Sequence, residues 1–133
     1  MRSTEKLAVV FDPSARWLEA IADTLSASGI TVVGRTRELA QARELVERHE
    51  PELLVADAAG SGIDVIRDAR SRVPTLRAIA LGTVGDAGLI TAAFAAGAAA
   101  FVVKTERFDT FGAALRELTT GPVVARARET DVA

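Results

Sequence analysis

The chain lacks cysteine altogether and contains only one histidine and one tryptophan. Without cysteine it can form neither a disulfide framework nor a cysteine-based zinc site. The single histidine, His49, excludes a multi-histidine metal centre and most Ser–His or Cys–His catalytic groupings. The longest weakly polar stretch, Leu89–Val103, is too short to span a bilayer, and no signal peptide is visible. We therefore expect a cytoplasmic protein without a membrane segment.

The chain also lacks a large excess of either charge. It has 16 Lys and Arg residues and 18 Asp and Glu residues, which give a net charge of -2. Nucleic-acid binding needs a clustered positive excess, so this balance argues against DNA or RNA as a direct partner. The 133 residues, 49% hydrophobic and 26% charged, are typical of one globular domain.

Short apolar runs alternate with amphipathic stretches five times along the chain. The expected strands are Leu7–Phe11, Ile30–Val33, Leu53–Ala56, Leu76–Leu81 and Ala99–Val103. Each is followed by apolar residues at helical spacing, and Thr36 is expected to cap the second helix. The pattern predicts an α/β fold, a doubly wound five-stranded parallel sheet in the flavodoxin-like order 2-1-3-4-5, with helices on both faces. Residues 122–133 show no periodicity and are expected to be a C-terminal tail or the start of a linker.

Charged residues follow three of these strands directly. Asp12 follows the first strand, Asp57 the third and Lys104 the fifth. The carboxyl ends of parallel strands meet at one edge of the sheet, where ligands bind in this class of fold. We therefore expect the two carboxylates and the ammonium group to lie close together on one rim.

Three segments carry a resemblance to a known family. They are Pro51–Asp57, which ends in an acid after an apolar strand, the loop Gly60–Asp64, and Gly97–Lys104, which reads Gly-Ala, then an aromatic residue, then Lys. In this order and spacing they resemble the receiver domains of two-component response regulators. The resemblance covers residues 5–121 and implies a signalling protein and not an enzyme.

The resemblance also implies a role for each matching residue. Asp57 would be the phosphoacceptor, and Mg²⁺ would be held by Asp12, Asp57 and the backbone carbonyl of Ala59. The phosphoryl group would be bound by Lys104 and Thr83, and the switch positions would be Phe101 and Gly82. The partner would be a sensor histidine kinase or another protein, and a second copy of the chain is a further option. The signalling surface would be formed by the fourth helix, fifth strand and fifth helix.

Two positions depart from the family pattern. Family members carry two adjacent acids after the first strand, where this chain reads Phe11-Asp12-Pro13, and a different alignment would remove both acids from the site. The fourth strand should end in Thr or Ser, but Gly82 stands there, with Thr83 one step on. We expect weak Mg²⁺ binding, and we expect Phe11→Asp with Gly82→Thr to restore the site.

Two functions remain open at this point. The chain is either a receiver phosphorylated on Asp57 or a degenerate receiver that acts as a protein-interaction or ligand-sensing module. A flavin or dinucleotide enzyme on the same fold is disfavoured, because no fitting glycine-rich loop follows a strand. The ending Gly121–Val124 resembles the region before a LuxR-type DNA-binding domain, so a longer regulator is a further option.

Overall fold

The computed structural model describes residues 6–83, 87–105 and 107–120. Five parallel strands form one sheet in the order β2-β1-β3-β4-β5, as the sequence pattern predicts. The strands are β1 (Leu7–Phe11), β2 (Thr31–Thr36), β3 (Leu53–Asp57), β4 (Arg77–Gly82) and β5 (Ala100–Val103). The expected tail or linker, residues 122–133, lies outside the described residues.

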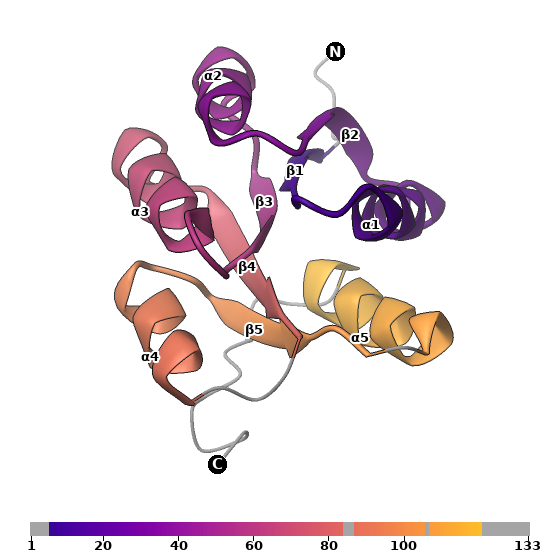
Figure 1. Cartoon of the computed structure of the whole chain (residues 1–133). Coiled ribbons are helices and arrows are strands. Elements are labelled where there is room, and N and C mark those ends of the chain that lie inside the picture. The colour runs from indigo at the N-terminus through magenta and orange to yellow at the C-terminus, as the bar shows by residue number, and fades with distance from the viewer. Residues whose placement is uncertain (1–5, 84–86, 106, 121–133) are drawn as a thin grey trace.

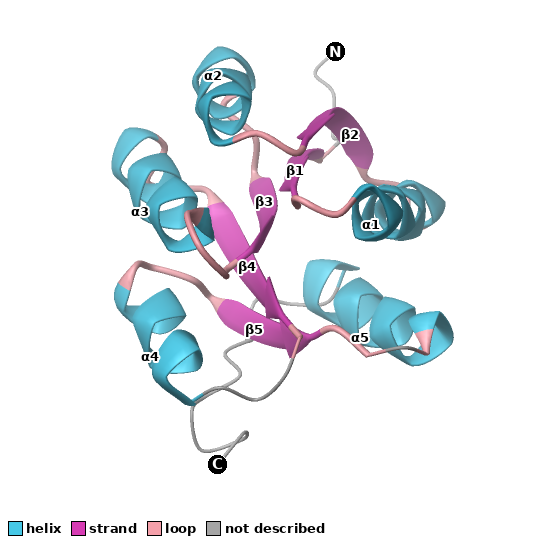
Figure 2. Cartoon of the chain, viewed as in Figure 1, coloured by secondary structure: helices cyan, strands magenta, loops and turns pink. Residues whose placement is uncertain are grey.

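Helices cover both faces of the sheet (Figures 1 and 2). They are α1 (Ala15–Ala27), α2 (Leu39–His49), α3 (Gly62–Arg72), α4 (Ala87–Ala95) and α5 (Phe108–Thr120). Helices α1 and α5 lie on one face, and α2, α3 and α4 lie on the other (Figure 1). Each face has its own buried apolar cluster, so the strands between them are apolar on both sides.

The second βα unit differs from the expected one. Thr36 is the last residue of β2 and pairs with Phe11 of β1, whereas helix α2 begins only at Leu39. The Thr36 hydroxyl still accepts a hydrogen bond from the Glu38 N–H at 3.0 Å, so it stabilises the turn before the helix. The residue that caps α2 is Glu38, whose side chain makes no capping hydrogen bond.

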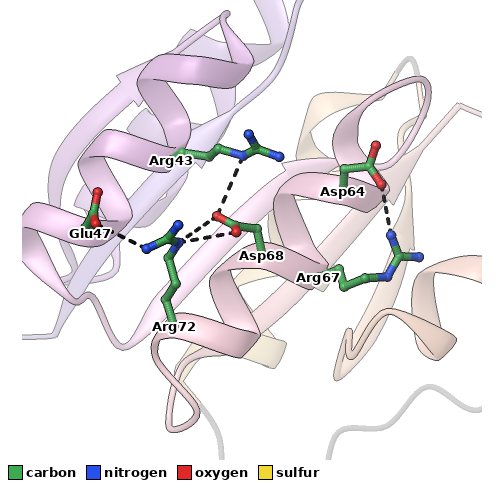
Figure 3. A network of polar contacts seen from close by, with 6 residues as sticks. All are labelled: Arg43, Glu47, Asp64, Arg67, Asp68 and Arg72. Atoms are coloured by element: carbon green, nitrogen blue, oxygen red, sulfur yellow. Dashed lines mark hydrogen bonds and ion pairs between the residues drawn. The ribbon is translucent and has the colours of Figure 1, made fainter.

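A network of exposed ion pairs connects α2 to α3 (Figure 3). Asp68 is its centre, because its carboxylate pairs with Arg72 of the same helix at 3.1 Å and with Arg43 of α2 at 3.7 Å. Arg72 also reaches Glu47 of α2 at 3.1 Å. The two positive and two negative charges balance, and ion pairs this exposed add little to stability. No helix in the described residues is long and apolar enough to cross a membrane.

Candidate functional site

Three charged side chains converge at the carboxyl ends of the strands, as their positions in the sequence predict. The Lys104 ammonium nitrogen lies 2.7 Å from Asp12 Oδ2 and 3.2 Å from Asp57 Oδ1. All three side chains are nearly inaccessible, with exposed fractions of 4% for Lys104, 1% for Asp12 and 8% for Asp57. The arrangement is a buried triad with one positive and two negative charges.

Asp12 is held by the chain on either side of it. Its backbone N–H donates to the Thr36 carbonyl at 3.1 Å, and its Oδ1 accepts a hydrogen bond from the Ser14 N–H at 2.9 Å. Phe11, one residue earlier, packs instead into the apolar cluster under α2, α3 and α4. Asp12 therefore lies in the site, next to Lys104.

Asp57 is positioned by the turn that follows β3. The backbone carbonyl of Asp57 lies so close to Gly62 that a Cβ atom there would be 1.6 Å from its oxygen. Glycine at position 62 thus lets helix α3 begin directly against the end of β3. The carbonyl of Ala59, inside this turn, accepts a hydrogen bond from the Gly62 N–H at 3.1 Å.

The triad forms the floor of a pocket of about 550 Å³. The pocket is lined by Asp12, Pro13, Ser14, Trp17, Asp57, Ala59, Thr83, Leu89 and Lys104. Thr83, expected to bind a phosphoryl group, is among these residues and follows the last residue of β4. Trp17 of α1 packs against the apolar cluster on its face of the sheet and also lines this pocket, with its ring centroid 5.3 Å from the Lys104 ammonium nitrogen. This cation–π contact, between helix α1 and the residue after β5, could not be predicted from the helical spacing of Trp17.

Burial raises the pKa of the Asp57 carboxyl above its ordinary value of 3.8. The nearby Lys104 ammonium lowers this pKa through its charge and its hydrogen bond, and the negative charge of Asp12 raises it further. The net direction is upward, because loss of water around the carboxylate outweighs the single positive charge.

The two expected switch positions are in direct contact. A Cβ atom on Gly82 would lie 2.6 Å from Cζ of the Phe101 ring and 3.4 Å from Cδ2 of Leu89. Phe101 is only 5% exposed. The Phe101 ring therefore occupies the space that a side chain at the end of β4 would take.

Several of the oxygen atoms proposed for Mg²⁺ already have a polar partner. Both carboxylates contact the Lys104 ammonium, and the Ala59 carbonyl accepts the Gly62 hydrogen bond. Within the described ranges there is no group of three or more acidic, histidine or cysteine side chains that could hold a metal ion. Mg²⁺ usually takes one or two carboxylates and keeps several waters, so Asp12, Asp57 and the Ala59 carbonyl would supply its protein ligands. In this structure the Lys104 ammonium contacts one oxygen of each carboxylate.

The chain matches the profile of one protein family. The profile of the response regulator receiver domain matches residues 8–116. The chain belongs to the response regulator receiver family. It is thus part of the two-component signalling systems, and the expected fold and family are both confirmed.

Solved receiver structures share the fold at low sequence identity. The signal receiver domain of NarL from Mycobacterium tuberculosis is 24% identical with a TM-score of 0.76, and the match covers 90% of this chain and 100% of that one. A LuxR-family two-component response regulator from Aurantimonas sp. SI85-9A1 is 20% identical with a TM-score of 0.78, covering 97% of this chain and 93% of that one. A response regulator from Thermotoga maritima is 21% identical with a TM-score of 0.74, covering 88% and 99%. No curated protein sequence matches the chain.

Proposed function

We propose that this receiver signals through protein contacts without depending on Mg²⁺-assisted phosphorylation of Asp57. The observation that carries the proposal is the Phe101 ring packed beside Gly82, where a Cβ atom would lie 2.6 Å away. In the receiver pattern Phe101 is the switch residue and Gly82 replaces a hydroxyl that binds the phosphoryl group. Here the aromatic side chain is already buried, and no side chain at position 82 couples it to Asp57.

The acidic triad supports the same proposal. Transfer of a phosphoryl group to Asp57 needs positive charge close to the negatively charged oxygens of the transferred group. Lys104 is the one cation in contact with Asp57 in the described residues, and it also neutralises Asp12. The site therefore offers little charge for the transition state.

A partner would contact the face formed by α4, β5 and α5. The exposed positions of α4 carry no charge and are Ala87, Gly88, Thr91 and Ala95. A surface helix of this kind suits close approach of another protein more than contact with an ion or a nucleic acid. The partner would be a histidine kinase, an effector domain or a second copy of the chain. We also propose that the receiver domain spans residues 5–121 and that a tail begins at residue 122.

The second candidate is a working phosphoreceiver. It is favoured by the Lys104 ammonium 3.2 Å from Asp57 Oδ1, in an open pocket large enough for a phosphoryl group. Asp57 would attack the phosphodonor, Asp12 and the Ala59 carbonyl would help to hold the metal, and Thr83 with Lys104 would bind the phosphoryl oxygens.

Labelling with acetyl phosphate separates the two candidates. The protein is incubated with acetyl phosphate and Mg²⁺ and followed by intact mass, with Asp57→Asn as the control. We expect slow labelling to low occupancy, none in Asp57→Asn, and no change in the NMR signals of β5 around Phe101. Full labelling within minutes, with a shift of those signals, would overturn the proposal in favour of the second candidate.

A further inference from the structure

A second pocket, of about 580 Å³, lies at the opposite edge of the sheet from the acidic triad. Its lining includes Lys6, Glu52 and Leu76, which directly precede β1, β3 and β4, so the pocket is at the amino ends of the strands. It also reaches Thr119, close to the end of α5. A pocket of this volume is large enough for a small organic molecule.

Three basic side chains line this pocket, those of Lys6, Arg70 and Arg77. None of the three pairs with a carboxylate in the part of the chain that the structure describes. Backbone carbonyls hold two of them at the end of α5, because Arg77 Nη1 donates to Leu118 at 2.9 Å and the Lys6 ammonium donates to Thr119 at 3.5 Å. A carbonyl group positions a cation without neutralising it, so these side chains keep their full positive charge.

Glu52 is the single acid among the residues that line the pocket. Its Oε1 accepts a hydrogen bond from the Leu7 N–H at 2.7 Å and pairs with none of the three cations. Three positive charges and one negative charge favour an anion over a cation or a neutral ligand. Leu53 and Ala98 also line the pocket, which gives room for an apolar part of the same ligand.

Arg70 carries a hydrogen-bond donor that lacks an acceptor. Its Nη1 donates to the carbonyls of Pro74 and of Leu76, the latter at 2.9 Å. Its Nε is buried and has no partner in the described residues. Gly97 lies beside this nitrogen, and a Cβ atom there would be only 3.2 Å from it. A buried N–H without an acceptor is costly, and a small rotation of the guanidinium group would turn it toward an oxygen atom in the pocket.

We propose that this pocket binds a small organic anion, a carboxylate or a phosphate ester with an apolar part, through Arg70, Arg77 and Lys6. The guanidinium group suits the oxygens of both anions. The ligand would contact the turn before β5 and the end of α5, two elements of the face proposed for protein contacts. The pocket shares no lining residue with the acidic site, so this inference goes beyond the proposed function and can fail without it.

An NMR titration of the unchanged protein tests this proposal. Phenyl phosphate and benzoate are the two anionic probes, and benzyl alcohol is the uncharged comparison. We expect at least one anion to give saturable shifts of the Arg70 and Arg77 Nε–H signals and of the backbone signals of residues 97–99. The tighter of the two identifies the class of anion. Equal affinity for benzyl alcohol, or no saturable shift with either anion, would overturn the proposal.

Arg77→Gln should weaken binding of the tighter anion about tenfold, because a charged hydrogen bond to the ligand is lost. Arg67→Gln is the matched control. Arg67 is exposed on α3, pairs with Asp64 at 2.9 Å and does not line the pocket, so its loss removes the same charge from elsewhere. We expect this control to bind as the unchanged protein does. Equal weakening in the two variants would show general attraction to a basic protein and would overturn the proposal.

Glu52→Gln keeps the proposal testable if Arg77→Gln does not fold. Glutamine retains an oxygen that can accept the Leu7 N–H but removes the negative charge from the pocket. We expect the anion to bind severalfold more tightly, a result that damage to the fold would not produce. Glu44→Gln on the exposed face of α2, where Glu44 pairs with Arg48, should leave the affinity unchanged. Unchanged or weaker binding in a folded Glu52→Gln variant would overturn the proposal.

Discussion

At Asp57, burial raises the pKa of the carboxyl group and the neighbouring Lys104 ammonium lowers it. The pKa is raised, so burial dominates, and the ionised form costs the folded state free energy. A raised acid pKa contributes stability that is present below the unfolded value of 3.8 and is lost as the pH rises through the folded pKa. A residue expected to do chemistry is therefore also one that weakens the fold at neutral pH.

Asp57→Asn should raise the free energy of unfolding at pH 7. Asparagine keeps the shape of the side chain but carries no charge, and Lys104 keeps Asp12 as its partner at 2.7 Å. The gain should shrink as the pH falls toward 3.8, because the wild-type carboxyl then binds its proton. Urea unfolding between pH 4 and about 7 measures it, with Asp23→Asn on the exposed face of α1 as the control. A loss of stability at pH 7 would mean that the Lys104 pair outweighs burial.

Gly62→Ala should destabilise the fold by about 1–3 kcal/mol. The added methyl group would lie 1.6 Å from the Asp57 carbonyl oxygen, so the start of α3 must move away from β3. Gly60→Ala is the comparison, because it has free space around it but a φ of +60°. That variant should lose about 1 kcal/mol from backbone strain alone. Urea unfolding that ranks Gly60→Ala as the more damaging change would contradict the close approach at Gly62.

Among the elements, β4 and β5 form the contact on which the proposed function depends. Gly82 ends β4, and Phe101 is the second residue of β5, so the ring reaches across the pair of strands. The sequence showed that position 82 lacks a hydroxyl. It could not show that the aromatic ring fills the vacated space, because that depends on the side-chain conformation of Phe101 in the folded sheet.

Gly82→Thr should push the Phe101 ring outward instead of simply restoring a binding hydroxyl. We expect a cost of about 1–3 kcal/mol from overpacking. The cost should fall when Phe101→Ala is also present, because the space beside residue 82 is then free. A double-mutant cycle by urea unfolding, with NMR signals of the Phe101 ring, measures the coupling. Additive effects of the two changes would show that the ring does not occupy that space.

The boundaries of the elements show where sequence patterns are sufficient. Four of the five strands lie within a residue or two of the expected ranges, because apolar runs of that length define them. The second strand extends three residues further, to Thr36, since pairing with Phe11 of β1 continues beyond its apolar part. Tertiary pairing and not local composition sets that end, and the start of α2 moves to Leu39 with it.

For the whole molecule, the sheet order explains why the site was predictable and its chemistry was not. The carboxyl ends of parallel strands lie at one edge of the sheet, so residues that directly follow β1, β3 and β5 must lie near one another. The positions of Asp12, Asp57 and Lys104 in the sequence were therefore enough to predict that they share a site. The bridging position of the ammonium and the Trp17 contact depend on packing between strands and helices far apart in the chain. The same packing decides whether the family's missing acid can be put back.

Phe11→Asp should damage the whole fold more than it restores the site. Phe11 is 4% exposed and belongs to the apolar cluster shared by β1, β3, α2, α3 and α4. Removing a buried aromatic side chain costs about 3–5 kcal/mol, a large part of the stability of a domain of this size. The new carboxylate would also be buried in this apolar cluster, so its loss of water adds to the cost.

Phe11→Asn separates these two effects, because it removes the ring without adding charge. We expect both variants to lose stability in urea unfolding, and we expect Phe11→Asp to be less stable than Phe11→Asn at pH 7. The difference in the free energy of unfolding should narrow toward pH 4, as the carboxylate is protonated. A Phe11→Asp variant as stable as wild type and rapidly labelled by acetyl phosphate would contradict the core role of Phe11. If the loss is as large as expected, the phenylalanine stabilises the domain at the position where other receivers hold an acid, and stability and phosphorylation make opposite demands on one residue.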